Sequence, residues 1–133
     1  MGYADERADI ETVFAAEFGA IRPGIPIAFE NMKFSTPTGP YLRLTIVGAS
    51  SEQVTMGESK LFESRGFVQV DVHVTTGTGT GLARTIADEI CGIFRGRAVG
   101  SALFRAPYAK PYGADGDHYR VIVTAPFTRH EYA

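Results

Sequence analysis

A glycine-rich segment, Thr76-Gly-Thr-Gly-Thr-Gly-Leu82, comes closest in this sequence to a motif that performs chemistry. Backbone amides at the start of a helix can bind phosphate groups. The segment lacks the Gly-Lys-Ser/Thr ending of a nucleotide-binding loop and the Gly-x-Gly-x-x-Gly spacing of a dinucleotide-binding turn. We therefore interpret it as a flexible connector in which Thr78 or Thr80 caps the following helix.

The residues that could bind a metal ion or act as nucleophiles are scattered. His73, His118 and His130 lie far apart in the sequence, and none is spaced from Cys91 as zinc ligands are. The segment Asp115–His118 contains two acids but lacks the twelve-position pattern of a calcium loop, so we expect a turn. Cys91 is the single cysteine, which excludes an intrachain disulfide, and we expect it to be a small buried apolar residue. No Gly-x-Ser-x-Gly elbow is present. We predict no catalytic residue, no cofactor and no metal, and a protein that is not an enzyme.

Length and charge narrow the function classes further. The chain has 133 residues, which suits one domain spanning 1–133. It carries 13 basic and 15 acidic residues, so its charge gives no reason to expect nucleic acid or an anionic membrane as a partner. It shows neither a basic N-terminal segment before an apolar run nor an apolar stretch near the ~20 residues that span a bilayer. We therefore expect a protein that starts in the cytoplasm without an export signal.

The central elements are a strand and a helix within residues 66–95. Val68, Val70, Val72 and Val74 alternate with more polar residues, which is typical of a strand with one buried face. After the glycines the apolar spacing changes to three and four, as on a buried helix face, in a run made by Leu82, Ile86, Ile90, Ile93 and Phe94. The pattern predicts a helix that folds back over the valine face, and Gly66 is interpreted as a bulge.

The remaining chain predicts an α+β fold. We expect a helix over 5–18, an edge strand over 25–29, strands over 41–47 and 119–125, a short strand over 101–107 and a loop over 108–117. Most strands alternate rather than being apolar throughout. This favours a two-layer arrangement in which a mixed or mainly antiparallel sheet has two helices packed on one face.

Two regions could contact partners. The uncovered sheet face would carry polar side chains that could pair across strands or meet another subunit: Arg43, Gln69, Asp71, His73 and Arg120. The polar stretch 49–63 lies between two strong strands, so we predict either a protruding hairpin or a mobile arm. Its interface candidates are Gln53, Met56, Glu58 and Lys60.

Several local stretches together resemble one family, the small tail terminator or tail-completion proteins of long-tailed bacteriophages. The most specific feature is the Gln-Val-Asp-Val strand that leads into the Gly-Thr-Gly helix start. The stretches cover nearly the whole chain, and they are Ile27-Ala-Phe-Glu-Asn31, Pro37-Thr-Gly-Pro-Tyr-Leu-Arg43, Glu52-Gln-Val-Thr55, Gly66-Phe-Val-Gln-Val-Asp-Val72, Gly77-Thr-Gly-Thr-Gly-Leu82 and Tyr119-Arg-Val-Ile-Val-Thr-Ala-Pro-Phe127.

The resemblance implies a structural protein of the virion tail, assembled in the bacterial host cytoplasm. It also implies a hexameric ring of identical subunits that caps the tail tube, stops its growth and presents a surface to the head-completion or connector protein. Two alternatives stay open. The chain could be another phage neck or connector component, or a small ligand-binding or enzymatic domain that uses the sheet face near Asp71, His73 and Arg120.

Overall fold

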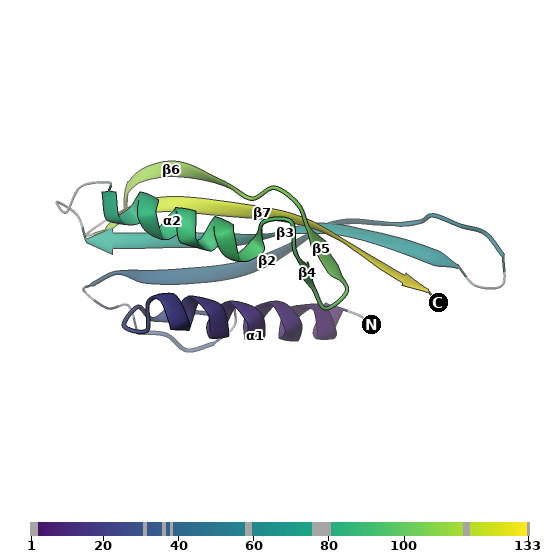
Figure 1. The fold of residues 1–133 in the computed structure, drawn as a ribbon, viewed down its shortest axis with the longest axis horizontal. Helices are drawn as coiled ribbons and strands as arrows, with labels where there is room; N and C mark the ends of the chain where they lie inside the picture. Colours follow the sequence, from purple (N-terminus) through teal and green to yellow (C-terminus); the bar gives the residue numbers. More distant parts are fainter. Residues whose placement is uncertain are drawn as a thin grey trace.

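The computed structural model describes residues 3–30, 32–35, 37, 39–57, 60–75, 81–115 and 118–132. Within these ranges the chain forms two helices and a seven-stranded sheet, mostly antiparallel and curled (Figure 1). The predicted α+β arrangement, with both helices on one sheet face, is therefore confirmed. The glycine-rich connector, including the proposed capping threonines, lies outside the described residues. In chain order the elements are α1 (Tyr3–Ile21), β1 (Ile27–Ala28), β2 (Tyr41–Gln53), β3 (Leu61–Thr75), α2 (Gly81–Phe94), β4 (Ala98–Val99), β5 (Ala102–Phe104), β6 (Tyr108–Asp115) and β7 (His118–Tyr132).

Strand β3 is the centre of the sheet. The strand order is β1-β2-β3-β7-β5-β4, and β6 also pairs with β7. β3 pairs antiparallel with β2 on one side and with β7 along its whole length on the other. β1 pairs in parallel with β2, as expected for a short edge strand beside a proline. Every backbone group of β3 can therefore be satisfied within the sheet.

The core lies between the sheet and the two helices. The four alternating valines of β3 are fully buried, as the sequence predicts. A row of phenylalanine rings connects four elements, with centroids 4.8–5.7 Å apart: Phe18, Phe14, Phe94, Phe104 and Phe127. Such contacts between rings add to the free energy gained by burying their area. Cys91 is buried, and burial raises the pKa of its thiol, which fits the predicted apolar role.

The segment after the predicted second strand is a hairpin. β2 continues past Val47 to Gln53, and β3 returns from Leu61, so residues 50–65 form a structure that we call the arm. Figure 1 shows the arm extending beyond the helices. The loop is closed by two backbone N–H groups: that of Val54 donates to the Leu61 carbonyl at 2.7 Å, and that of Leu61 to Thr55 Oγ1 at 2.8 Å. Of the two predicted alternatives, the structure forms the hairpin.

The bulge at the base of the arm is in β2 and not at Gly66. The register shifts between Gly48 and Ser50, so Ala49 is the extra residue, whereas Gly66 pairs regularly with Gly48. Gly66 is required for a different reason. A Cβ atom there would lie 2.5 Å from the Val47 carbonyl oxygen and 3.2 Å from Cζ of Phe127. The bulge brings the neighbouring backbone so close that only glycine fits.

Two predictions for the C-terminal part are wrong. The expected loop 108–117 is mostly strand β6, which tolerates Pro111 because it lies at the sheet edge and has a bulge between Pro111 and Gly113. The last strand does not end at Ala125 but continues to Tyr132. Pro126 is accommodated because it falls between the part of β7 that pairs with β6, which ends at Thr124, and the part that pairs with β5.

A buried ion pair joins the first turn of α1 to the end of β7. Arg129 is 1% exposed and donates from Nε to Oε1 of Glu6, 6% exposed, at 3.0 Å. Nη1 of Arg129 also donates to Glu131 at 3.2 Å, and its guanidinium lies 5.1 Å from the Tyr3 ring centroid. Glu6 lies on the same helix face as the buried residues Ile10, Phe14 and Phe18. The ion pair therefore lies next to the apolar core, at the N-terminal end of this face. Arg129 lies beyond the end of the strand that the sequence predicts over 119–125.

Candidate functional site

The sheet face opposite the helices carries a polar cluster at its centre. Asp71 accepts a hydrogen bond from Nε2 of Gln69 at 3.0 Å, and its Oδ2 lies 3.6 Å from Nη1 of Arg120 on β7. The Arg120 guanidinium lies over the Tyr112 ring, 4.3 Å from its centroid. The predicted pairing of opposite charges across strands is therefore present. Asp71 is only 8% exposed, so it can serve mainly to orient Arg120.

The expectation that this face is open at His73 is wrong. The His73 ring is 4% exposed because it stacks on Tyr41, with centroids 4.3 Å apart and planes 3° from parallel. His118 packs edge-on against both rings and lies 3.3 Å, through Nε2, from the carbonyl oxygen of Gly39. The Phe34 ring also packs against Tyr41, with centroids 5.5 Å apart. Phe34, from the segment before β2, and His118 therefore cover this end of the sheet. His73 is buried by packing within the subunit.

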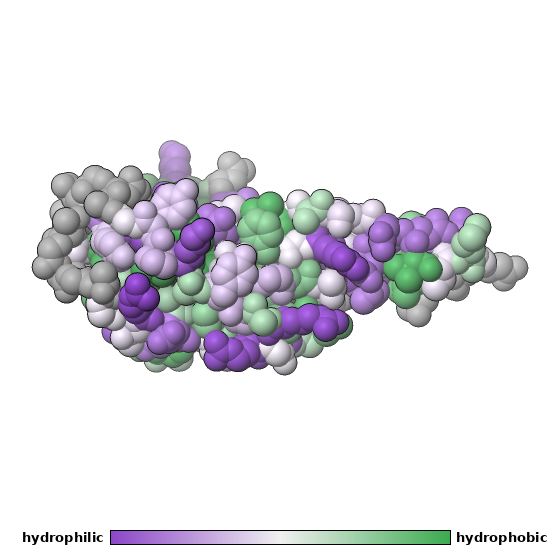
Figure 2. All heavy atoms as spheres, turned by 90° about the horizontal axis from the view of Figure 1, so that it is seen from above, coloured by the Kyte–Doolittle hydropathy of each residue, from purple (hydrophilic) through white to green (hydrophobic). Residues whose placement is uncertain are grey.

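The other sequence candidates are exposed and divide between the sheet face and the arm. Arg43 is exposed on β2, directly opposite Asp71 in the register. On the arm, Gln53 and Lys60 are exposed, and Met56 is 92% exposed beside the partly exposed Val54. Glu58 lies outside the described residues. Figure 2 shows the arm as a narrow extension on which hydrophilic and hydrophobic residues lie side by side. Among the large apolar side chains that the structure describes, Met56 is the most exposed.

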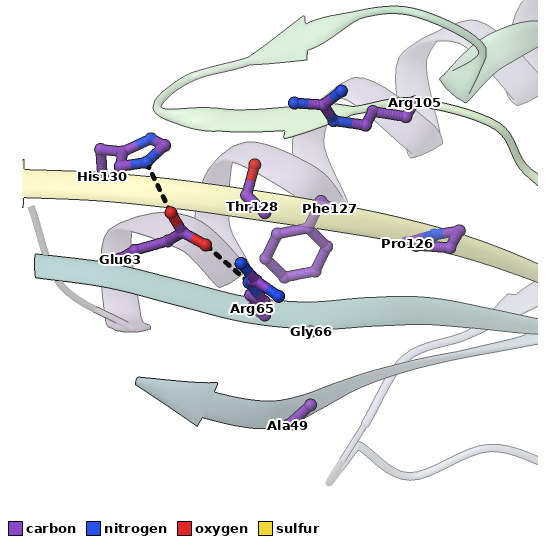
Figure 3. Close-up of a pocket in the computed structure, with 9 residues that line it drawn as sticks. All are labelled: Ala49, Glu63, Arg65, Gly66, Arg105, Pro126, Phe127, Thr128 and His130. Carbon is purple, nitrogen blue, oxygen red and sulfur yellow. Dashed lines mark hydrogen bonds and ion pairs between the residues drawn. The ribbon is translucent and has the colours of Figure 1, made fainter. Parts of the chain in front are cut away.

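The sheet face is hollowed at the base of the arm. A pocket of about 410 Å³ lies there, and its floor and walls come from β2, β3, β7 and the segment after β5 (Figure 3). Its charged residues are Arg65, Arg105, His130 and Glu63. Its apolar floor is made by Ala49, Gly66, Pro126 and Phe127. We call it the base pocket.

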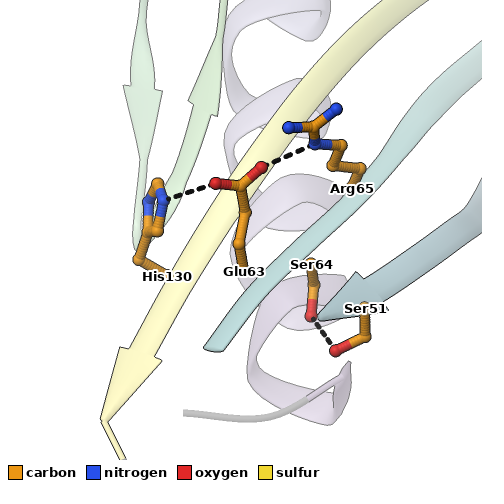
Figure 4. Close-up of polar contacts among 5 residues, drawn as sticks. All are labelled: Ser51, Glu63, Ser64, Arg65 and His130. Carbon is orange, nitrogen blue, oxygen red and sulfur yellow. Dashed lines mark hydrogen bonds and ion pairs between the residues drawn. The ribbon is translucent and has the colours of Figure 1, made fainter. Parts of the chain in front are cut away.

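One carboxylate organises the base pocket. Glu63 accepts a hydrogen bond from Nε of Arg65 at 2.6 Å, and its other oxygen lies 3.1 Å from Nε2 of His130 (Figure 4). The Arg65 guanidinium, followed by His130, lowers the pKa of the Glu63 carboxyl, so the group stays ionised well into the acid range. Glu63 in turn raises the pKa of Arg65. Arg65 is exposed and Glu63 is half-buried, so the pair orients these side chains more than it stabilises the fold.

None of the four charged residues of the base pocket was among the sequence candidates. Glu63 and Arg65 could have been found by extending the alternation of β3 backwards, because they share the phase of Gln69 and Asp71. His130 lies beyond the strand predicted over 119–125, and Arg105 follows a three-residue strand, so neither carries a periodic signal. Their meeting depends on how β5 and β7 pair, which the sequence pattern does not specify.

The described residues contain no cluster of three or more His, Cys, Asp or Glu side chains placed to hold a metal ion. In the same residues, neither helix combines the length and apolar character needed to cross a bilayer. The described chain is thus an α+β fold with one helix-covered face, one polar sheet face and a projecting arm.

The comparisons with known proteins give the family. A family model described as phage tail terminator protein matches residues 9–127 of the 133-residue chain. The chain therefore belongs to the phage tail terminator family, a family of structural proteins, and the resemblance seen in the sequence is confirmed. A solved structure whose title names no function matches over 99% of both chains, with a TM-score of 0.68 and 23% sequence identity. At this identity the match supports the fold alone. The comparison with curated proteins gives no match.

Proposed function

We propose that this protein caps the tail tube of a long-tailed phage, stops tube polymerisation and provides the surface to which the head-completion protein attaches. Family membership carries the proposal. In this view the protein works as a hexameric ring in the virion tail, after assembly in the host cytoplasm. A ring of identical subunits needs two different surfaces on each subunit that meet by rotation. In this proposal the arm and the body supply these two surfaces, and the support is that the arm extends beyond the helices (Figure 1).

We propose that the arm contributes to contacts within the ring or with the tube. The support is its exposed apolar tip, Val54 and Met56, at the end of a hairpin that buries little of its own surface. An exposed apolar group gains free energy when a partner covers it, at about 25 cal/mol per Å² buried. The sheet-face candidates Arg43, Gln69 and Arg120 lie on the same surface as the base pocket and form a second contact region in this proposal.

The test replaces residues 55–60 with Asn-Gly, which keeps Val54 opposite Leu61 in a two-residue hairpin turn. The variant is expected to keep the circular dichroism spectrum and melting temperature of the parent. A phage that lacks its own copy of the gene and is supplied with this variant should produce over-long, uncapped tails by electron microscopy. Tails of normal length joined to heads would contradict the role of the arm.

A matched pair of single substitutions separates the arm from general surface effects. Met56→Ser removes the exposed methionine of the arm, and Met32→Ser removes one that is 62% exposed elsewhere. Only Met56→Ser should reduce the yield of capped tails. If tails in the complete absence of the protein have normal length but lack heads, the proposed terminator role is overturned in favour of a connector role.

A further inference from the structure

The base pocket has hydrogen-bond donors that its internal contacts leave unused. Arg65 contacts Glu63 through Nε, and the two Nη atoms of its guanidinium take no part in that bond. Arg105 is exposed and forms no ion pair with any residue that the structure describes. Figure 3 shows its side chain beside β7, on the side to which Thr128 points, with the guanidinium directed toward His130. A planar guanidinium presents paired N–H donors in the geometry that a carboxylate accepts.

The charge of the base pocket selects the kind of anion. Two arginines and one glutamate give a net charge of +1 with His130 neutral and +2 with it protonated. With His130 neutral, a single carboxylate balances this charge, whereas a phosphate dianion would leave one negative charge in excess. Nucleic acid binds to extended basic surfaces, whereas this chain has 13 basic and 15 acidic residues overall.

The apolar floor indicates that the carboxylate belongs to a protein segment. Pro126 and the buried Phe127 ring lie beside the charged groups, so a side chain that brings methylene groups with its carboxylate would contact both. Four glutamates of the two helices, Glu6, Glu11, Glu17 and Glu89, are engaged in ion pairs inside the subunit and are not free to supply this carboxylate to a neighbouring copy.

We propose that the base pocket is a docking site for an acidic segment of another protein, with one Asp or Glu carboxylate bound between Arg65 and Arg105. Glu63 acts as a positioning residue that holds Arg65 and His130 at the rim. The identification of the partner as a tail or connector component rests on the proposed function above. The binding chemistry of the pocket does not depend on it.

The test is an NMR titration of the ¹⁵N-labelled protein with N-acetyl-tetraglutamate amide, and with the tetraglutamine analogue as a neutral control. Shifts are expected at the backbone amides of Ala49, Gly66 and Thr128 and at the Nε–H groups of Arg65 and Arg105. Arg105→Glu should weaken binding at least tenfold. The control Arg84→Glu changes the charge equally on the exposed side of α2 and should leave binding unchanged.

Three results would overturn the proposal: equal shifts with the tetraglutamine peptide, shifts spread over the surface, or equal loss of binding in both charge variants. Inorganic phosphate that binds as tightly at the same residues would also overturn it, by showing a general anion site. Tail assembly is scored separately with Arg105→Glu. Peptide binding that is lost while heads and capped tails still form would keep the carboxylate site and remove its link to the tail.

Discussion

The two faces of one set of strands serve different purposes in this protein. Leu44, Val70 and Val123 lie side by side on β2, β3 and β7 and are completely buried under the helices. One position further along β2 and its paired strands, Thr45, Gln69 and Thr124 lie on the opposite face and are half-buried. The helix-covered face therefore supplies most of the apolar burial that stabilises the fold. The other face carries polar side chains. These residues can be substituted to suit a partner without a change in the core.

The difference between the faces becomes smaller at the arm. Beyond the bulge at Ala49 the helices end, and the side chains on their side of the sheet include Ser51, Gln53, Phe62, Ser64, Arg129 and Glu131. Ser64 contacts Ser51 through their hydroxyl groups at 3.4 Å (Figure 4). The core thus gives way to a polar three-stranded ribbon, and the transition is made by the Arg129–Glu6 ion pair. The same strands pack on apolar side chains under the helices and make polar contacts outside them.

The largest effect is expected at this transition. Arg129→Met should lower the free energy of unfolding by about 3–5 kcal/mol, because it leaves the Glu6 carboxylate buried without its main partner. The measurement is urea denaturation followed by circular dichroism. The double variant Glu6→Leu with Arg129→Met should recover much of the loss, since no buried charge remains. A double variant as unstable as the single one would show that packing rather than charge dominates here.

A smaller effect should distinguish the two faces at adjacent residues. Leu44→Ala removes a fully buried side chain and should cost about 2–5 kcal/mol. Thr45→Ala, one residue on but on the open face, should change the free energy of unfolding by roughly 0.5 kcal/mol or less. Thermal and chemical denaturation of both variants provide the check. Equal losses would mean that the open face is as important to stability as the core.

The smallest effect concerns the paired glycines beside the bulge. Gly66→Ala forces the Val47 carbonyl or the Phe127 ring to move and should cost about 1–3 kcal/mol. Gly48→Ala, at the directly paired position, meets no atom within 4 Å and should be close to neutral. The two melting temperatures give the answer. A neutral Gly66→Ala would show that the bulge can relax.

The sequence was sufficient where periodicity is strong. The valines of β3 and the apolar spacing of α2 predicted a two-layer fold with helices on one face. The apolar face of the strand and the apolar face of the helix can both be buried only if they pack against each other. The sequence was insufficient where the structure of a segment depends on the strands that pair with it. Pro111 lies in the predicted loop 108–117, and Pro126 directly follows the predicted end of the last strand. Both prolines nevertheless lie in strands, because the local strand pairing does not require the backbone N–H that proline lacks. The base pocket brings together side chains from distant strands, which no local spacing reveals.

The Glu6–Arg129 contact has a consequence for how the chain acquires its structure during synthesis. The two residues are separated by 123 positions, so Glu6 on the first helix cannot pair with Arg129 until nearly all of the remaining chain has been translated. At ~5–20 residues per second this interval is roughly 6–25 s. Throughout that time the carboxylate can remain hydrated, and the helix can seat fully against the sheet only when the final strand has left the ribosome.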